Sequence, residues 1–221
     1  MEGRDKTFAL VLGIPLVAYA VEAVLACPAV SRLVLVLPPG FLARGEELSR
    51  ARAWGPRVRL CAGGARRQDS VRLGLEALSA TGGCDWVVVH DGARPCLSPE
   101  LVAVGLKAAA DTGAAVAAIP LRDTIKQVDR GGWVVSTPPR EQLRAIQTPQ
   151  IFRYDLLLEA HRRVGLDMTD DAAMVETIGG RVRTFPGAAD NIKVTVPADL
   201  VLAEAVLSRR SLGPGGAGGW E

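Results

Sequence analysis

Short apolar runs that alternate with amphipathic stretches constrain the fold of this chain most. Three runs are apolar at consecutive positions, over residues 33–37, 86–89 and 114–119. Strands of this kind are covered on both faces, as in a parallel sheet between helices. The pattern therefore predicts an α/β domain with a mostly parallel, doubly wound sheet.

The stretches between these runs have the apolar spacing of helices. Ser98 and Pro99 mark the start of one of them, because serine is a favoured N-cap and proline suits the first helical position. The expected helices cover residues 15–26, 70–78, 98 onward, 155–164, 170–178 and 197–207. Strand and helix alternation of this kind supports the doubly wound arrangement.

Residues 126–150 interrupt the alternation. They contain Gly131-Gly132, Pro138-Pro139 and alternating apolar positions, which predicts a two-stranded arm that projects from the body. The body is expected to span residues 1–210. The last residues, 211–221, contain five glycines and one proline, which predicts a flexible tail.

Composition argues against several classes of protein. A hydrophobic fraction of 48% is enough for a sizeable core, and a net charge of +2 does not favour a nucleic-acid binder. The four cysteines form no CxxC pair, which disfavours a zinc site, and with no secretory signal they fit the cytoplasm. Gly13, Pro15 and Glu22 interrupt the apolar stretch 8–26, so no membrane span is expected.

An acid and an arginine follow directly after the apolar run 86–89. Ligands bind at strand ends in open α/β sheets. Asp91 could hold Mg²⁺ beside phosphates, and Arg94 could grip a phosphate with its two-pronged guanidinium. The alternative is a turn with a surface ion pair.

Two further segments carry potential phosphate ligands. Gly63-Gly64 leads through Arg67 and Ser70 into a helix, whose N-terminal N–H groups favour anions; the alternative is an ordinary capped helix. Lys193 lies between β-branched residues, which suits an ammonium that reaches a polar site, although edge strands also carry lysines.

Taken together, these segments resemble one family. The chain from Lys6 to Arg209 resembles the 2-C-methyl-D-erythritol 4-phosphate cytidylyltransferases in the order and spacing of its motifs. The matching motifs are Gly63-Gly64-x-x-Arg67-x-x-Ser70, His90-Asp91-Gly92-Ala93-Arg94-Pro95, Arg122-Asp123-Thr124-x-Lys126, Arg140 with Thr148-Pro149-Gln150, Thr169-Asp170-Asp171-Ala172 and Ala189-Asp190-Asn191-Ile192-Lys193-Val194-Thr195.

The resemblance implies a Rossmann-like nucleotidyltransferase fold and transfer of CMP from CTP to a polyol phosphate, with Mg²⁺ or another divalent cation. It implies CTP contacts from Gly63, Gly64, Arg67, Ser70 and Asp91, with Asp91 also on the metal side. The polyol phosphate contacts implied are Asp91, Arg94, Thr124, Arg140, Thr148, Thr169 and Lys193. Lys6, Arg140 and Lys193 are the implied catalytic residues.

The resemblance also implies a homodimer with exchanged arms. Arg140, Thr148 and Thr169 correspond to contacts that come from the neighbouring subunit, with Arg140 and Thr148 on the arm. No nucleic-acid or membrane partner is expected.

The match is incomplete at the start. Family members begin with a strand and a glycine-rich loop that ends Gly-x-Arg-Met or Gly-x-Arg-Leu, and Met1–Phe8 corresponds only to the end of that element. A single glycine, Gly13, offers no cradle for a triphosphate, so we reject residues 8–12 as its replacement. We expect a natural product longer by roughly 15–25 residues, or else a real truncation.

Three alternatives to this function remain. The acceptor could be ribitol 5-phosphate instead of methylerythritol phosphate. A shortened chain could bind sugar phosphates without turnover. It could also be an incomplete fragment that needs a partner.

Overall fold

The computed structural model describes residues 6–80 and 82–211. Its helices are α1 Leu16–Leu25, α2 Leu42–Ala51, α3 Arg67–Ser79, α4 Pro99–Ala109, α5 Tyr154–Arg163, α6 Asp171–Thr177 and α7 Pro197–Ser211. Its strands are β1 Leu10–Val11, β2 Ile14–Pro15, β3 Leu33–Leu37, β4 Val58–Ala62, β5 Trp86–Val89, β6 Ala114–Pro120, β7 Gln127–Val128, β8 Val134–Ser136, β9 Arg144–Arg153 and β10 Arg183–Pro186. Short 3-10 helices complete it: η1 Lys6–Phe8, η2 Pro39–Phe41, η3 Gly55–Arg57 and η4 Arg140–Gln142.

The central sheet has four strands in the order β10-β6-β9-β5. Strand β10 is parallel to β6, whereas β9 is antiparallel to both of its neighbours. A separate parallel pair, β3 and β4, carries the expected run 33–37. The α/β class is therefore confirmed. The sheet is mixed, not mostly parallel, because β9 lies at its centre; part of β9 belongs to the region that the sequence assigns to the arm.

The core lies on both faces of the central sheet, as the consecutive apolar positions predict. Along β6, Ala114 and Val116 pack with residues of α3, α5 and α6, while Ala115 and Ala117 pack with α1 and α4. Successive strand residues point to opposite faces. Both faces of β6 are therefore covered by helices, which places the strand ends, not the faces, next to solvent.

The first described residues do not form a strand of the main sheet. Residues Lys6–Phe8 form η1, and β1 and β2 form an antiparallel hairpin. Its turn residues Leu12 and Gly13 have φ values of 50° and 77°, the left-handed conformation that two-residue hairpin turns require. The rejection of residues 8–12 as a parallel strand with a phosphate loop is confirmed, while the expectation for Met1–Asp5 lies outside the described residues.

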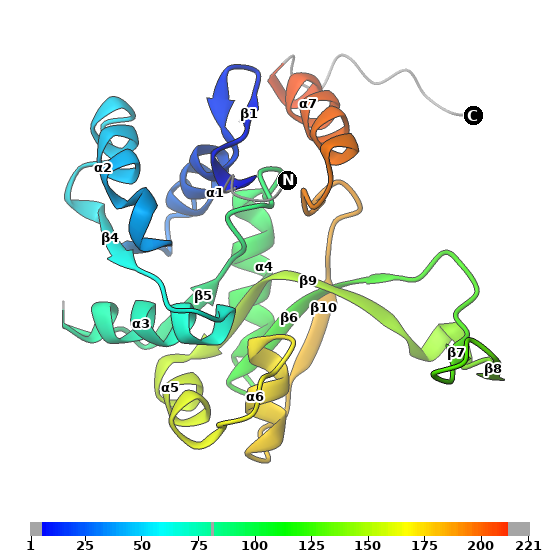
Figure 1. Ribbon diagram of the computed structural model, residues 1–221. Helices are drawn as coiled ribbons and strands as arrows, with labels where there is room; N and C mark the ends of the chain where they lie inside the picture. Colours follow the sequence, from blue (N-terminus) through cyan, green and yellow to red (C-terminus); the bar gives the residue numbers. More distant parts are fainter. Residues whose placement is uncertain (1–5, 81, 212–221) are drawn as a thin grey trace.

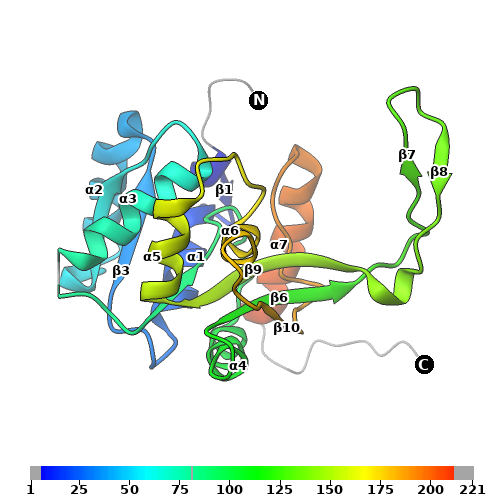
Figure 2. The same cartoon turned by 90° about the horizontal axis from the view of Figure 1, so that it is seen from below.

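Figures 1 and 2 show β7 and β8 well away from the α-helices, beyond the ends of β6 and β9. These strands pair only with each other within the described residues. The exposed apolar side chains on these strands and in the turn between them are Val128, Trp133, Val134 and Val135. At the end of the described chain, Ser211 belongs to α7, so its assignment to the tail was wrong. The rest of the expected tail, residues 212–221, lies outside the described residues.

Close packing of α4 on the sheet yields a testable expectation. A Cβ atom at Gly105 would lie 2.2 Å from Ile151 Cδ1 and 2.7 Å from Phe185 Cζ. Alanine favours helices by about 1 kcal/mol over glycine, but overpacking a core costs about 1–3 kcal/mol. We expect Gly105→Ala to lower the free energy of unfolding, as measured by urea denaturation.

The control for this substitution is Gly40→Ala, because a Cβ at Gly40 would meet no atom within 4 Å. It should leave stability nearly unchanged. A Gly105→Ala protein as stable as the parent would contradict the packing described for α4.

Candidate active site

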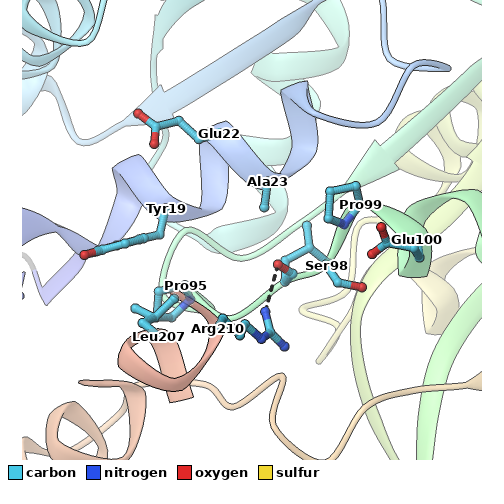
Figure 3. Close-up of a pocket in the computed structure, with 10 residues that line it drawn as sticks. Tyr19, Glu22, Ala23, Pro95, Ser98, Pro99, Glu100, Leu207 and Arg210 are labelled. Atoms are coloured by element: carbon cyan, nitrogen blue, oxygen red, sulfur yellow. Dashed lines mark hydrogen bonds between the residues drawn. The ribbon is translucent and has the colours of Figure 1, made fainter. Parts of the chain in front are cut away.

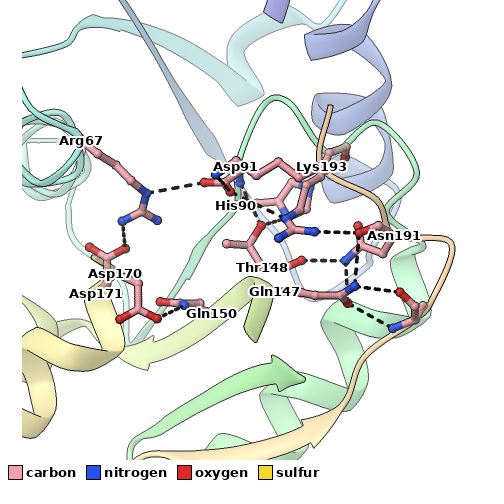
Figure 4. Close-up of polar contacts among 12 residues, drawn as sticks. Arg67, His90, Asp91, Gln147, Thr148, Gln150, Asp170, Asp171, Asn191 and Lys193 are labelled. Carbon is pink, nitrogen blue, oxygen red and sulfur yellow. Dashed lines mark hydrogen bonds and ion pairs between the residues drawn. The ribbon is translucent and has the colours of Figure 1, made fainter. Parts of the chain in front are cut away.

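The candidate site is built around Asp91, which follows β5 at its carboxyl end. A turn brings Arg94 back toward this carboxylate, with the Arg94 N–H donating to the Asp91 carbonyl at 2.9 Å. Three basic side chains surround Asp91: Lys193 at 2.9 Å, Arg67 at 3.6 Å and Arg94 at 3.7 Å. Figure 4 shows Arg67 and Lys193 on either side of this carboxylate. The three basic residues come from three distant parts of the sequence, and together they make a site suited to anions.

Lys193 reaches the site from the extended segment between β10 and α7. Val194, the next residue, is buried and donates its N–H to the Ala93 carbonyl at 2.8 Å. This bond ties the segment to the turn after β5. The interpretation of Lys193 as a lysine that emerges into a polar site is therefore supported by its contact with Asp91.

Arg94 is buried and only partly paired. Its NH1 donates to the Asn191 carbonyl at 2.8 Å, and its Nε has no hydrogen-bond partner among the described residues. Burial lowers the pKa of Arg94, and the attraction of Asp91 opposes that change. The Nε of Arg94 faces the Asp91 carboxylate at 3.7 Å, so Arg94 adds a fixed positive charge beside Asp91, which suits an anionic ligand.

The charge of Asp91 is set by its neighbours. Burial alone would raise the pKa of this carboxyl group, but Lys193 and Arg67 together hold it below its ordinary value. Asp91 is thus ionised at neutral pH. The site presents one carboxylate within a surplus of positive charge.

The backbone of Asp91 is fixed by a hydrogen-bond chain that sequence reasoning missed. The Asp91 N–H donates to Thr148 Oγ1 at 3.1 Å, and Thr148 Oγ1 lies 3.0 Å from His90 Nδ1. His90 Nε2 lies 3.2 Å from the Arg94 carbonyl, which can only accept, so Nε2 carries the proton and Thr148 donates to Nδ1. Burial lowers the pKa of His90 to about 4, which keeps the ring neutral.

Thr148 does not lie on the projecting hairpin, and that expectation was wrong. It is a buried residue of β9 in the central sheet of the same subunit. Its neighbour Gln147 donates to the Ala188 carbonyl at 2.9 Å, and Asn191 Nδ2 donates to the Thr148 carbonyl at 2.7 Å. These bonds join β9 to the segment that carries Lys193, and distant partners of this kind leave no local signal in the sequence.

The Gly63-Gly64 loop lies at the N-terminus of α3. The Gly64 N–H donates to Ser70 Oγ at 3.1 Å, and that hydroxyl donates to the Arg66 carbonyl at 3.2 Å. A Cβ at Gly63 would lie 2.8 Å from Ser70 Oγ, so a side chain there would collide with this hydroxyl. Ser70 therefore holds the loop against the helix, and Arg67, the first residue of α3, extends to Asp91.

Four other predicted residues are not joined to this cluster within the described chain. Lys6 lies in η1, and its charge acts on Asp199 of α7. Arg140 lies in η4 and donates to the Arg122 carbonyl at 2.7 Å. Thr124 and Thr169 are exposed, in the segments after β6 and before α6. One subunit thus brings together Asp91, Arg94, Arg67 and Lys193, but not the whole predicted set.

No group of three or more histidine, cysteine, aspartate or glutamate side chains suited to a metal ion occurs among the described residues. Asp91 offers a single carboxylate to the site. Mg²⁺ commonly takes one or two carboxylates and completes its shell with substrate phosphates and water. The donor set at Asp91 fits an ion that arrives with a phosphate ligand and does not fit an all-protein metal cage.

A pocket of about 510 Å³ lies elsewhere, between α1, the segment after Arg94 and the end of α7 (Figure 3). Its lining includes Tyr19, Glu22, Leu97 and Arg210, and none of the predicted site residues. Glu22 and Arg210 are already paired with Arg52 and Asp190. This pocket therefore lacks the chemistry that gathers at Asp91.

No helix in the described parts of the chain combines the length and apolar character needed to cross a membrane.

Comparison with known proteins gives a consistent result. The family model described as 2-C-methyl-D-erythritol 4-phosphate cytidylyltransferase matches residues 1–209. A curated protein of that name from Dehalococcoides mccartyi strain CBDB1 is 44% identical over 209 residues, which cover 95% of this chain and 91% of the relative.

Solved structures agree with the sequence comparison. The 2-C-methyl-D-erythritol 4-phosphate cytidylyltransferase from Thermus thermophilus matches with a TM-score of 0.74 and 38% identity, over 92% of this chain and 94% of that one. The 4-diphosphocytidyl-2C-methyl-D-erythritol synthase from Anaerococcus prevotii matches with a TM-score of 0.85 and 26% identity, over 95% and 92% of the two chains.

Proposed function

Because the chain belongs to the 2-C-methyl-D-erythritol 4-phosphate cytidylyltransferase family, we propose that the site around Asp91 is where its reaction takes place. The chain is a nucleotidyltransferase that joins CMP from CTP to 2-C-methyl-D-erythritol 4-phosphate in isoprenoid synthesis. The products are 4-diphosphocytidyl-2-C-methyl-D-erythritol and pyrophosphate. The observation that carries the assignment is the convergence of Arg67, Arg94 and Lys193 on one strand-end carboxylate.

For CTP, we assign the loop Gly63-Gly64 with Ser70, and Arg67 at the start of α3. Support comes from the position of these residues at a helix N-terminus, where N–H groups and the helix dipole favour phosphates. Arg67 has further N–H donors for a triphosphate beyond the one that it gives to Asp171.

For the polyol phosphate, we assign Arg94 and Lys193 with Asp91. Arg94 adds a positive charge beside Asp91, and Lys193 is half-exposed beside the same carboxylate. Thr124 and Thr169 complete the proposed contacts. Thr148 has a positioning role in this scheme. Its hydroxyl already accepts from the Asp91 N–H and donates to His90 Nδ1, so it orients Asp91 and His90.

The chemistry is a direct displacement. An oxygen of the 4-phosphate forms a bond to the α-phosphorus of CTP, while the bond from that phosphorus to the bridging oxygen breaks and pyrophosphate leaves. No covalent enzyme intermediate is needed, so positioning and charge neutralisation supply the catalysis. Lys193, Arg140 and Lys6 are the cations proposed to stabilise the developing charge.

Mg²⁺ or another divalent cation would be held by Asp91 together with phosphate oxygens. Such an ion neutralises phosphoryl charge and orients the leaving group when bound. The residues of the chain bind and align the two phosphates around it.

We also propose a Rossmann-like nucleotidyltransferase fold in which β7 and β8 form an arm. The exposed apolar residues Val128, Trp133, Val134 and Val135 lie on or between these strands, and exposed patches of this kind mark interaction surfaces. In a two-fold dimer, each arm would carry its Arg140 to the partner's site. CTP is a cytoplasmic metabolite, so we assign the enzyme to the cytoplasm.

Substrate identity is tested by measuring pyrophosphate release from CTP and Mg²⁺ with two acceptors. Methylerythritol 4-phosphate should support turnover. Ribitol 5-phosphate has one more carbon and lacks the methyl branch, so it should be poorer by at least about tenfold, the discrimination that a difference of one methylene gives in a shaped pocket. Turnover with ribitol 5-phosphate alone would replace the proposed acceptor. Calorimetric CTP binding with neither acceptor consumed would identify a binding module without turnover.

A further inference from the structure

We propose that Asp171, oriented by His161, is the positioning residue that sets Arg67 for the nucleotide; this inference rests on the proposed function. Asp171 is fully buried at the first position of α6. One carboxylate oxygen lies 2.7 Å from Arg67 NH1, and the other lies 3.1 Å from His161 Nε2. A buried carboxylate thus divides its two oxygens between the arginine of the site and a buried histidine of α5.

The burial of this carboxylate makes its partners essential. A buried charge is strongly destabilising unless it is paired and hydrogen-bonded. Arg67 supplies the opposite charge to Asp171, and the His161 ring donates the second hydrogen bond through Nε2. Because the His161 side chain is 2% exposed and that of Asp171 is 0% exposed, the contact between these two residues is shielded from solvent. Asp171 is therefore held by one partner on each of its two oxygens.

Hydrogen bonds fix the start of α6, where Asp171 lies. Asp170 caps α6 by accepting from the Ala173 N–H at 2.9 Å, and the Ala172 N–H donates to Gln150 Oε1 at 3.3 Å. Gln150, a buried residue of β9, also donates to Asp170 at 2.8 Å. These bonds fasten the start of α6 to the central sheet, so Asp171 is held by the core.

Arg67, in contrast, spans two parts of the site (Figure 4). Its contact with Asp171 is a hydrogen bond of 2.7 Å, whereas its Nε is 3.6 Å from Asp91. Its side chain is 36% exposed, so one end is anchored and the rest faces the space where a ligand would bind. The short, buried contact decides where the guanidinium lies, and Asp91 adds a weaker attraction. Asp171 acts on the nucleotide through Arg67 and touches no substrate itself.

The substitution that isolates this role is Asp171→Asn. Asparagine keeps the shape, but it loses the charge and has only one acceptor oxygen. It can therefore accept a hydrogen bond from Arg67 or from His161, but its NH₂ group would face the other donor. Charge-assisted hydrogen bonds are roughly twice as strong as neutral ones. We expect the KM for CTP to rise about tenfold, while the KM for the polyol phosphate changes little.

A second substitution addresses the same contact from the other side. His161→Leu removes the donor to Asp171, whereas His161→Gln keeps an N–H within reach. The KM for CTP should rise in the first variant and should be closer to the parent value in the second. Thermal melting of each variant identifies any that fail to fold. If Asp171→Asn does not fold, the comparison of His161→Leu with His161→Gln provides the test.

A double mutant separates positioning from general stability. If Asp171 acts through Arg67, then Asp171→Asn should raise the KM for CTP no further once Arg67→Ala is present. Glu76→Gln is the matched control, because Glu76 is an exposed carboxylate on the same helix α3 that pairs with Arg72 and not with the Asp91 site.

The outcomes are distinct. An unchanged KM for CTP in folded Asp171→Asn and His161→Leu proteins, or additive effects of the Asp171 and Arg67 substitutions, would overturn the positioning role and leave the activity standing. A parent protein that transfers no CMP would instead overturn the proposed function.

Discussion

Replacing Asp91 by asparagine should reduce the rate of CMP transfer by about 10²–10³-fold, the effect expected when a preorganised charge in an active site is lost. Three basic groups lie within 3.7 Å of this carboxylate, and a neutral amide can neither balance them nor serve as a good Mg²⁺ ligand. The measurement is pyrophosphate release at saturating CTP and polyol phosphate. Circular dichroism should show an unchanged fold.

Asp111→Asn is the control for the loss of a carboxylate. Asp111 is exposed and pairs with Arg183 at 3.1 Å, away from the Asp91 site. It should keep full activity, since exposed ion pairs contribute little. Near-normal turnover in Asp91→Asn would refute the assignment of Asp91 to the reaction.

Mixing two inactive variants should restore activity. In the proposed dimer, each site takes Asp91 from one subunit and Arg140 from the arm of its partner. Arg140 makes no ion pair with the Asp91 cluster within one described subunit, and it lies in η4, next to the hairpin. A heterodimer of Asp91→Asn and Arg140→Ala subunits would then carry one intact site and one doubly altered site.

The expected yield follows from random assembly. Half of the dimers in an equal mixture are mixed, and each has one working site, so activity should reach roughly a quarter of the parent value. Differently tagged subunits allow the mixed dimers to be purified and counted. Absence of activity in purified heterodimers would rule out a shared site.

The sequence predicts the strands whose apolar runs are buried on both faces. The runs 33–37, 86–89 and 114–119 correspond to β3, β5 and β6, and Ser98 caps α4 as expected, accepting from the Leu101 N–H. Their signals are local: consecutive apolar residues, a cap and a proline. The less regular elements α2, β4 and β10 were not anticipated, because their short segments carry polar residues at several positions.

Strand β9 shows why the centre of the fold was misjudged. Its residues Gln147, Thr148 and Gln150 are polar and were assigned to a projecting arm, yet all three are buried. The Gln147 amide donates to the carbonyls of Ala188 and Asn191, the Thr148 hydroxyl pairs with His90, and the Gln150 amide donates to Asp170. All of these partners are far away in sequence. Polar character predicts exposure only when such partners are absent, and a single sequence does not reveal them.

The sequence predicts part of the site, namely the residues that have a local signal. Asp91 and Arg94 have a local signal, since they follow an apolar strand, and Lys193 is unusual among β-branched neighbours. The contact between His161 and Asp171 has none, because it joins two helices through side chains that only the folded core brings together. Site residues can be predicted when they follow a strand, because ligands bind at strand ends. Residues that only the packing of two helices brings together cannot be predicted from a single sequence.

A crystal structure of the protein with Mg²⁺, 2-C-methyl-D-erythritol 4-phosphate and the α,β-methylene analogue of CTP, which cannot release pyrophosphate, tests the central claim most directly. The account predicts nucleotide phosphates within hydrogen-bond distance of Arg67, and the 4-phosphate against Lys193 and Arg94. Nucleotide bound instead in the pocket of Tyr19, Leu97 and Arg210, with the Asp91 site unchanged, would contradict it.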